Sequence, residues 1–487
     1  MKRISFLVLC LVCALCVGAQ NSYEEFRRQQ QAAYNNYRKQ AQEEWEAYRE
    51  KANKEFANYM KTAWQKADRQ APIPMPEKPE PIVQPKKEDT EEPTIPQEVK
   101  VIPPAPAPEP YVKPEPVIPV EKTEKSKSPA TMFLFYDTPC SVHFDKSMKF
   151  TVADATEASA SAAWEKLATK SYDALLADCI GLRDRMHLSD WGYIRMLQVM
   201  TESFLGNKNE AILLQMYLLT QSGYRVRIAR TDERWVLLVP FTTDIYNYSF
   251  IQKGGVKYYV IDKAEGRRQF FVFDREFPNE KTASVRMSQA PVLAQSATRP
   301  RTLQSKKYPE IKLTLAENQN LIDFYNDYPV SSDWNYYSNA SISPDVKKTL
   351  YATLKPLLQG KDKKTAANML LNFVQTAFEY KTDQQQFGYE RPLFADETLY
   401  YPFCDCEDRS IFYSILVKEL LDLDVVLLNY PEHLATAVCF PDGQAYGSFL
   451  NYNKKKYTVC DPTYIGSSVG DCMPQYKTTQ PTIVKID

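Results

Sequence analysis

One cysteine near the carboxyl end of the chain lies where its thiol could act as a nucleophile. Cys406 belongs to the stretch FCDCEDRSIFYSIL and is expected to begin a buried helix. The free N–H groups and the dipole of a helix amino terminus stabilise a thiolate, and the same N–H groups can hold a developing oxyanion. The acidic neighbours Asp405, Glu407 and Asp408 oppose the thiolate. The thiol therefore needs a cationic partner.

His433 is the obvious partner, because the chain has only three histidines and this one opens the predicted strand HLATAVCF, twenty-seven residues after Cys406. We expect small side chains that let the helix approach closely to share the strand face of His433: Ala435, Ala437 and Cys439. Asp461 ends the later predicted strand KYTVCD and could orient the imidazole. Cys406, His433 and Asp461 would then act as nucleophile, base and orienting group.

These motifs carry a resemblance to a family. PLFADETL, DCED, EH and CDPTY with a trailing Gly resemble the transglutaminase-like (papain-related) cysteine hydrolase superfamily, over roughly Ser343 to Asp487. The resemblance implies a catalytic helix packed on an antiparallel sheet, with Cys406 as nucleophile, His433 as general base and Asp461 as the third member. It implies acyl transfer from a protein or peptide amide, through a thioester, to water or to an amine. One departure is Cys404, where the family usually has glycine.

Other roles stay open for the same residues. Cys406 could be a structural or disulfide cysteine in a non-enzymatic envelope scaffold, or could act with Cys404 in thiol–disulfide exchange, although the CxC spacing is unusual for that chemistry. A bridge between Cys404 and Cys406 would be strained. We expect no metal site, because a single nearby histidine among scattered cysteines lacks ligand spacing. No cofactor is indicated.

The chain contains two copies of one pattern. With an offset of 199 residues, 207–262 aligns without gaps on 406–461, and eleven of these 56 pairs are identical. In each copy a buried helix (NEAILLQMYLLTQSG, EDRSIFYSILVKELLD) precedes apolar strands, and Gly254-Gly255 predicts a hairpin turn. Both copies are therefore expected to be α+β, with helices preceding a mostly antiparallel sheet. The first copy has Asn207, Arg234 and Asp262 at the three site positions, so we expect it to be catalytically inactive.

The amino terminus has the pattern of a secretory signal peptide. Lys2 and Arg3 precede the apolar run ISFLVLCLVCALCV and the small-residue exit Val17-Gly18-Ala19. The run is about 14 residues, shorter than the roughly 20 that a membrane span needs, so a permanent anchor is the weaker interpretation. Lipidation is disfavoured, since no small residue precedes Cys13 or Cys16. Cleavage after Ala19 would export the protein to a periplasmic, envelope or extracellular location and leave seven cysteines, an odd number.

An eleven-residue repeat follows the signal peptide. The segments YEEFRRQQQAA, YNNYRKQAQEE, WEAYREKANKE and FANYMKTAWQK place aromatic residues in two columns. Eleven residues make about three helical turns, so both columns lie on one face of a long helix. This face needs a partner surface. We expect self-association in a bundle, with docking on another envelope component or a solvated helix as the alternatives.

Proline divides the chain. Seventeen of its 33 prolines lie between Pro72 and Pro129, which predicts an extended polyproline spacer. The net charge of −1 argues against a nucleic-acid or anionic-membrane binder. The predicted organisation is a signal peptide (1–19), a hendecad helix (20–70), a proline-rich disordered linker (71–129), a degenerate transglutaminase-like domain (130–295), a short linker (296–307) and a transglutaminase-like domain with the candidate triad (308–487).

Overall fold

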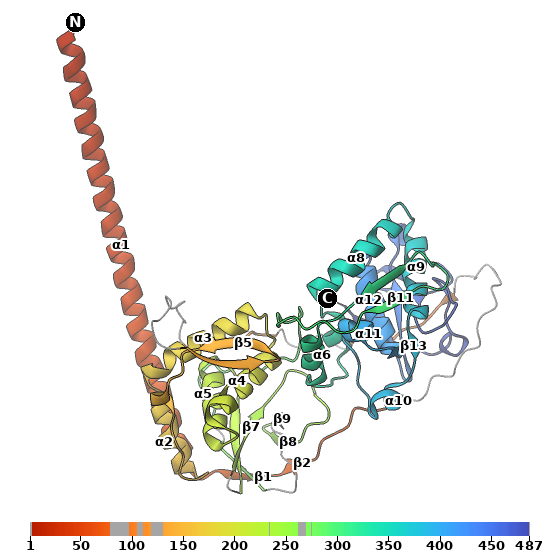
Figure 1. The fold of residues 1–487 in the computed structure, drawn as a ribbon, viewed down its shortest axis with the longest axis horizontal. Coiled ribbons are helices and arrows are strands. Elements are labelled where there is room, and N and C mark those ends of the chain that lie inside the picture. The colour runs from red at the N-terminus through yellow and green to blue at the C-terminus, as the bar shows by residue number, and fades with distance from the viewer. Residues whose placement is uncertain are drawn as a thin grey trace.

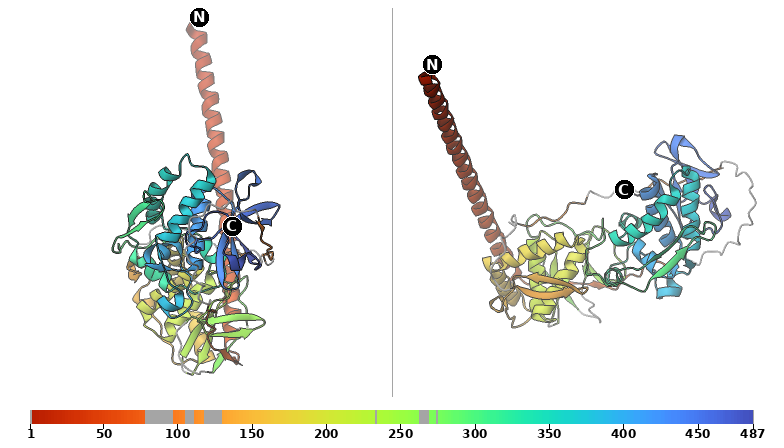
Figure 2. Two further views of the ribbon diagram at one scale, coloured as in Figure 1. Left: turned by 90° about the vertical axis from the view of Figure 1, so that its right-hand side faces the viewer. Right: turned by 45° about the horizontal axis from the view of Figure 1, so that its top comes forward.

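The computed structural model describes residues 2–77, 97–104, 111–117, 130–232, 234–261, 269–273 and 275–486, with side chains from residue 25 onward. The chain is a mixed α+β protein with a long amino-terminal helix and two larger, mainly antiparallel sheets, which confirms the α+β class and the long helix. The helix projects from the first of two folded domains, and the second domain lies on the other side of the first (Figures 1 and 2). Within the described residues, no helix combines the length and apolar character needed to cross a membrane.

The long helix is α1 (Lys2–Met60), and it includes most of the predicted signal peptide. It was expected to continue to about residue 70 but ends at Met60, where the Trp64 indole donates to the Met60 carbonyl oxygen at 3.1 Å. The chain then leaves the helix because the first sheet offers backbone partners to strand β1 (Gln65–Ala67). The helix end is buried on the first domain through Phe56, which is 2% exposed, whereas other rings of the repeat are exposed: Phe26, Tyr34, Tyr37, Trp45 and Tyr48.

The first domain is built on a seven-stranded sheet whose neighbouring strands pair antiparallel. Its order is β1-β10-β6-β7-β9-β8-β2, and Gly254 and Gly255 form the β8–β9 turn with positive φ angles, as predicted. Its helices and remaining strands are α2 (Glu157–Leu167), α3 (Asp173–Arg185), α4 (Asp190–Leu205), α5 (Asn209–Gln221), β2 (Arg69–Gln70), β6 (Arg227–Thr231), β7 (Arg234–Val239), β8 (Phe250–Lys253), β9 (Val256–Val260) and β10 (Phe270–Val272). A hairpin, β4 (Thr131–Phe135) and β5 (Thr138–Val142), packs on helices α3 and α4.

The second domain is built on a six-stranded sheet of order β19-β15-β16-β18-β17-β3. Its strands are β3 (Gln97–Glu98), β15 (Val425–Tyr430), β16 (His433–Val438), β17 (Ser448–Tyr452), β18 (Lys455–Cys460) and β19 (Thr482–Lys485). Helix α12 (Cys406–Leu421) packs on β15 and β16. The other helices are α6 (Gln319–Asn326), α7 (Trp334–Ser338), α8 (Pro344–Leu358), α9 (Lys363–Thr376), α10 (Asp383–Phe387) and α11 (Ala395–Tyr400).

The two sheets share one topology. The order β10-β6-β7-β9-β8 of the first repeats as β19-β15-β16-β18-β17 in the second. The pairing register repeats too: Leu238 pairs with Val260, and Ala437 with Val459, each 199 residues further on. A one-residue slip would turn every side chain to the other face, so a shared register gives corresponding residues corresponding orientations.

The proline-rich segment is not a disordered linker in its described parts. Strand β3 pairs in parallel with Ser448 and Phe449 of β17, and the Val117 amide donates to the Gln221 carbonyl at 2.9 Å. Proline lacks an amide hydrogen, but the residues between prolines keep theirs and can pair with an exposed sheet edge. The rest of the predicted linker lies outside the described residues.

The short linker predicted at 296–307 also forms structure. It contains β11 (Arg301–Gln304), which pairs antiparallel with β12 (Lys312–Leu315). Leu303 of the first strand and Leu313 and Leu315 of the second are buried, so this hairpin contributes to the apolar core.

Candidate active site

Cys406 is the first residue of α12, as predicted. The helix begins there because Asp408 accepts hydrogen bonds from two backbone amides, those of Leu393 (2.8 Å) and Asp405 (3.3 Å). A carboxylate at the third helical position that accepts from the backbone amide before the helix is one half of a capping box. The thiol therefore lies at the positive end of the helix dipole.

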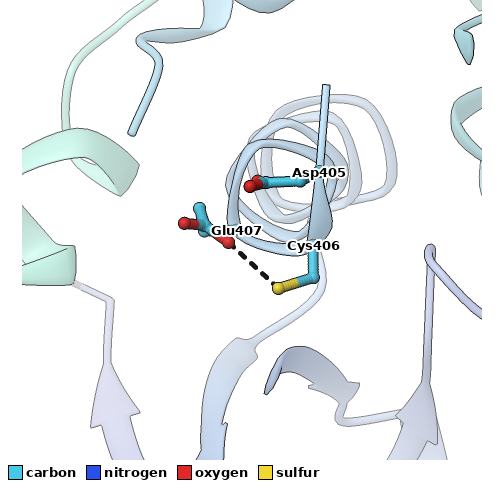
Figure 3. Close-up of side chains that lie close together, drawn as sticks. All are labelled: Asp405, Cys406 and Glu407. Carbon is cyan, nitrogen blue, oxygen red and sulfur yellow. Dashed lines mark hydrogen bonds between the residues drawn. The ribbon is translucent and has the colours of Figure 1, made fainter. Parts of the chain in front are cut away.

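In the structure the Cys406 thiol donates to its neighbour. Its Sγ lies 3.0 Å from Oε2 of Glu407, and both side chains are buried at the start of α12 (Figure 3). A carboxylate that accepts from the thiol favours the protonated thiol over the thiolate. The arrangement is thus that of a resting cysteine, and sequence reasoning did not anticipate this contact.

His433 and Asp461 form a buried pair. Nε2 of His433 lies 2.8 Å from Oδ2 of Asp461, and the two residues are 1% and 2% exposed. The other carboxylate oxygen, Oδ1, accepts from the backbone amides of Thr463 (2.9 Å) and Tyr464 (3.3 Å). This local turn fixes the Asp461 carboxylate so that it can orient the imidazole, and it gives the Asp-Pro-Thr motif a physical role.

The second imidazole nitrogen of His433 is available. Nδ1 is buried and has no hydrogen-bond partner among the described residues. One face of the ring is covered by Tyr476, with ring centroids 5.0 Å apart and an interplanar angle of 12°. One ring nitrogen of His433 is therefore bonded to the Asp461 carboxylate, and the other can accept a proton. A general base requires this arrangement.

Helix α12 lies against the start of the strand that carries His433. Oγ of Ser410, one turn after Cys406, donates to the Leu434 carbonyl at 2.7 Å. The face of β16 toward the helix, however, is made by Leu434 and Val438, which share a buried cluster with the helix.

The prediction that the Cys406 helix approaches the strand face of Ala435, Ala437 and Cys439 was therefore wrong. Ala435, Ala437 and Cys439 pack in a second apolar cluster, with Val459, on the opposite side of the sheet. Strand alternation places His433 in phase with these residues and out of phase with Leu434. His433 is the first residue of β16, and its ring pairs there with Asp461, which directly follows the last residue of β18.

Buried carboxyl groups surround the start of α12. Ligand atoms lie within 4.8 Å of one another in three sets: Asp405, Cys406 and Glu407; Asp383, Glu390 and Glu407; and Asp383, Asp405 and Asp408. Burial and the neighbouring carboxylates raise the pKa of Asp408 to about 7 and raise the pKa values of Asp383 and Asp405 well above the ordinary range. These are the residues of the site that could hold a cation, and histidine and cysteine spacing did not reveal them.

The cysteines of the described chain form no disulfide. Cys404 lies in the short strand β14 (Phe403–Cys404), which pairs with β13 (Glu379–Tyr380), and its Sγ accepts from Nε of Arg409 at 3.4 Å. Burial raises its pKa to about 11. Cys460 packs on the face toward α12, on the side of the sheet opposite Cys439.

The corresponding positions of the first domain are in contact with each other. The Arg234 guanidinium donates to the side-chain oxygen of Asn207. These residues correspond to His433 and Cys406 at the 199-residue offset, and Arg234 begins β7 as His433 begins β16. The third predicted position, Asp262, lies outside the described residues.

One supporting residue was missed by sequence reasoning. Nε2 of Gln375, on α9, donates to the carbonyl oxygens of Asp461 (3.2 Å), Tyr464 (3.0 Å) and Ser467 (3.3 Å). It clamps the loop that carries the orienting carboxylate. A glutamine inside an apolar helical segment was the only signal for it in the sequence.

No protein-family model, curated protein or solved structure matches this chain.

Proposed function

We propose that this chain is an exported, cysteine-dependent amide hydrolase or acyl transferase with two transglutaminase-like domains, of which the first is degenerate. The observation that carries the proposal is the buried His433–Asp461 pair, in which Nδ1 of His433 has no partner among the described residues. His433 is the first residue of β16, and β16 lies against α12, the helix that begins with Cys406. The contact between Arg234 and Asn207 supports it, because the shared topology brings the corresponding positions of the first domain together.

The reaction follows from these groups. The Cys406 side chain leaves Glu407 by rotation about its Cα–Cβ bond and transfers its proton to Nδ1 of His433. The thiolate attacks the amide carbonyl carbon, and N–H groups of the first turn of α12 stabilise the oxyanion. The imidazolium, stabilised by Asp461, then protonates the leaving amine as the C–N bond breaks. Water or a second amine attacks the thioester, gives its proton to His433 and releases Cys406.

Binding without catalysis is the second candidate, and one observation favours it. The Cys406 thiol is 4% exposed and donates to Glu407 rather than to His433. If this contact is permanent, the second domain shares the inactive character proposed for the first, and the whole chain acts as an envelope scaffold.

Alkylation of the native protein distinguishes the two candidates. We expect iodoacetamide at pH 7 to modify Cys406 faster than Cys439, a half-buried cysteine that directly follows β16. His433→Ala should slow the modification of Cys406 at least tenfold and leave that of Cys439 unchanged, as measured by mass spectrometry of peptides. Equal rates in the wild type, or no effect of His433→Ala, would favour the scaffold.

The reaction type needs a second assay. Release of a peptide amine indicates hydrolysis, and incorporation of a labelled primary amine indicates transfer. Cys406→Ala should abolish either signal. A signal that survives this substitution would contradict the proposal.

A further inference from the structure

A large cavity lies at the place in the first domain that corresponds to the candidate active site, and residues 326–330 and Tyr389 of the second domain complete its wall. Its volume is about 1140 Å³, and its wall includes Asn207, Arg234 and Val260. These residues precede Cys406, His433 and Val459 by 199 positions, the offset that relates the two sheets. The degenerate site is therefore open where the candidate active site is closed by burial.

A second hollow adjoins the first. Its volume is about 740 Å³, and Asn207 and Arg234 also lie in its wall. The hydrogen-bonded pair thus borders both hollows. Pockets for compact ligands are usually about 300–1,000 Å³, so the combined space suits an extended ligand that passes over this pair.

Cationic groups in the wall lack full compensation. Arg234 donates to a neutral amide and has no carboxylate partner among the described residues. Arg195 lies 3.6 Å from Asp327, but its Nε is buried without an acceptor in the described part of the chain. A guanidinium with unused donors is best satisfied by a carboxylate, which can accept two parallel hydrogen bonds.

The acidic groups of the large cavity are already engaged. Asp327 accepts from the hydroxyl of Tyr136 at 2.8 Å, and Glu202 accepts from the side-chain amide of Gln198 at 2.9 Å. They compete little for Arg234. The electrostatic preference of the cavity is therefore set by its arginines.

Aromatic side chains form much of the remaining wall: Trp191, Tyr246, Tyr248, Tyr328 and Tyr389. The indole N–H of Trp191 has no acceptor among the described residues. Rings with polar edges offer both an apolar surface and hydrogen bonds to an extended chain.

We propose that the first domain binds an acidic peptide across Asn207 and Arg234. Arginine at the position of the base and asparagine at that of the nucleophile remove acyl-transfer chemistry and provide donors for a carboxylate. That the ligand is a peptide rests on the proposed function of the second domain, whereas its negative charge rests on Arg195 and Arg234. The domain would hold an acidic segment of a substrate protein while the second domain acts on an amide elsewhere in it.

Fluorescence anisotropy on the mature chain tests this proposal. The probe is a dye-labelled hexapeptide with three glutamates and one tyrosine, and its control has glutamine in place of glutamate. We expect micromolar binding of the acidic peptide and at least tenfold weaker binding of the control. The double substitution Arg195→Gln with Arg234→Gln should weaken binding of the acidic peptide at least tenfold, and Arg185→Gln, at an exposed position on α3, should not.

Two further variants keep the outcome decisive. Tyr389→Ala alters an exposed ring, 44% accessible, and should weaken binding several-fold without affecting the melting temperature. Cys406→Ala should bind like the wild type even if no amide is cleaved, which separates this proposal from the proposed function. Equal binding of both peptides, insensitivity to the double substitution, or loss of binding in Cys406→Ala would overturn it. Arginine-dependent binding of a uronic-acid oligosaccharide with no binding of the peptide would also overturn it.

Discussion

Tyr476 stacks on His433 with ring centroids 5.0 Å apart and planes 12° from parallel. The ring centroid of Tyr430, the last residue of the neighbouring strand β15, lies 4.6 Å from that of Tyr476. The carboxyl-terminal segment thereby covers the imidazole that would accept the proton of Cys406. This ring shields one face of the imidazole.

Removing the ring should open the site. We expect Tyr476→Ala to raise the rate of iodoacetamide modification of Cys406 several-fold, because water and reagent reach the end of β16. Tyr476→Phe keeps the stacking and should leave the rate near that of the wild type. A rate that is unchanged in Tyr476→Ala would mean that another element limits access.

The charge of Asp461 should matter more than its shape. Asp461→Asn keeps an acceptor for the Thr463 and Tyr464 amides but removes the charge that stabilises a protonated His433. We expect Cys406 to react at least tenfold more slowly at pH 7, because general-base assistance contributes about 10²–10⁴-fold and this substitution weakens it. Reactivity of Cys439 and the circular dichroism spectrum serve as controls. Full reactivity of Cys406 in this variant would remove Asp461 from the site.

Glu317 should make stability depend on pH. It is 3% exposed, neither carboxylate oxygen has a partner among the described residues, and burial, with Asp396 nearby, raises its pKa to about 9. The folded state therefore binds this proton more tightly than the unfolded state, whose pKa is about 4.5. Its contribution to stability is fully present below pH 4.5 and is lost as the pH rises toward 9.

Glu317→Gln should remove this dependence. We expect its melting temperature to match that of the wild type near pH 4.5 and to exceed it increasingly up to pH 8, by about 2–4 °C for each kcal/mol in a domain of this size. Glu310→Gln is the matched control, because Glu310 is exposed and lies between β11 and β12, close in sequence to Glu317. Parallel melting curves of Glu317→Gln and the wild type at all pH values would contradict the assignment.

Docking of α1 should depend on Phe56. Its ring centroid lies 4.9 Å from that of Trp164 and 5.3 Å from that of Phe277. Phe56→Ala should cost about 3–5 kcal/mol of the free energy of unfolding and expose the end of α1 to limited proteolysis. Phe26→Ala, at a ring that is 58% exposed, should change neither. Equal effects of the two substitutions would contradict this docking.

Local patterns predicted several elements because their causes are local. The start of α12 at Cys406 follows from the acidic first turn and the apolar run, and the β8–β9 turn follows from two glycines that tolerate positive φ. The 199-residue offset predicted corresponding strands, and their pairing register agrees with it. Strand and helix periods need only neighbouring residues to appear.

Other features depended on distant contacts. The side of β16 that faces α12 was predicted wrongly, because alternation along a strand does not say which of its two faces a helix covers. The segment 162–182 has a helical apolar pattern throughout, but the structure divides it between α2 and α3 around Tyr172, whose ring is buried. Strand β3 was missed because its partner, β17, lies some 350 residues away, and a proline-rich composition says nothing about a free sheet edge.

The sequence by itself determined the residue types of the candidate site, their order and the duplicated pattern that contains them. Side-chain chemistry and hydrophobic periodicity depend only on the residues themselves and on their near neighbours in the chain. Tertiary structure decided that the predicted His433–Asp461 pair is buried, that Tyr476 covers the His433 ring, that Glu407 accepts from Cys406 and that a cavity stays open beside Arg234. The physical reason is that burial, hydrogen-bond geometry and access to solvent arise only when segments far apart in the chain pack together.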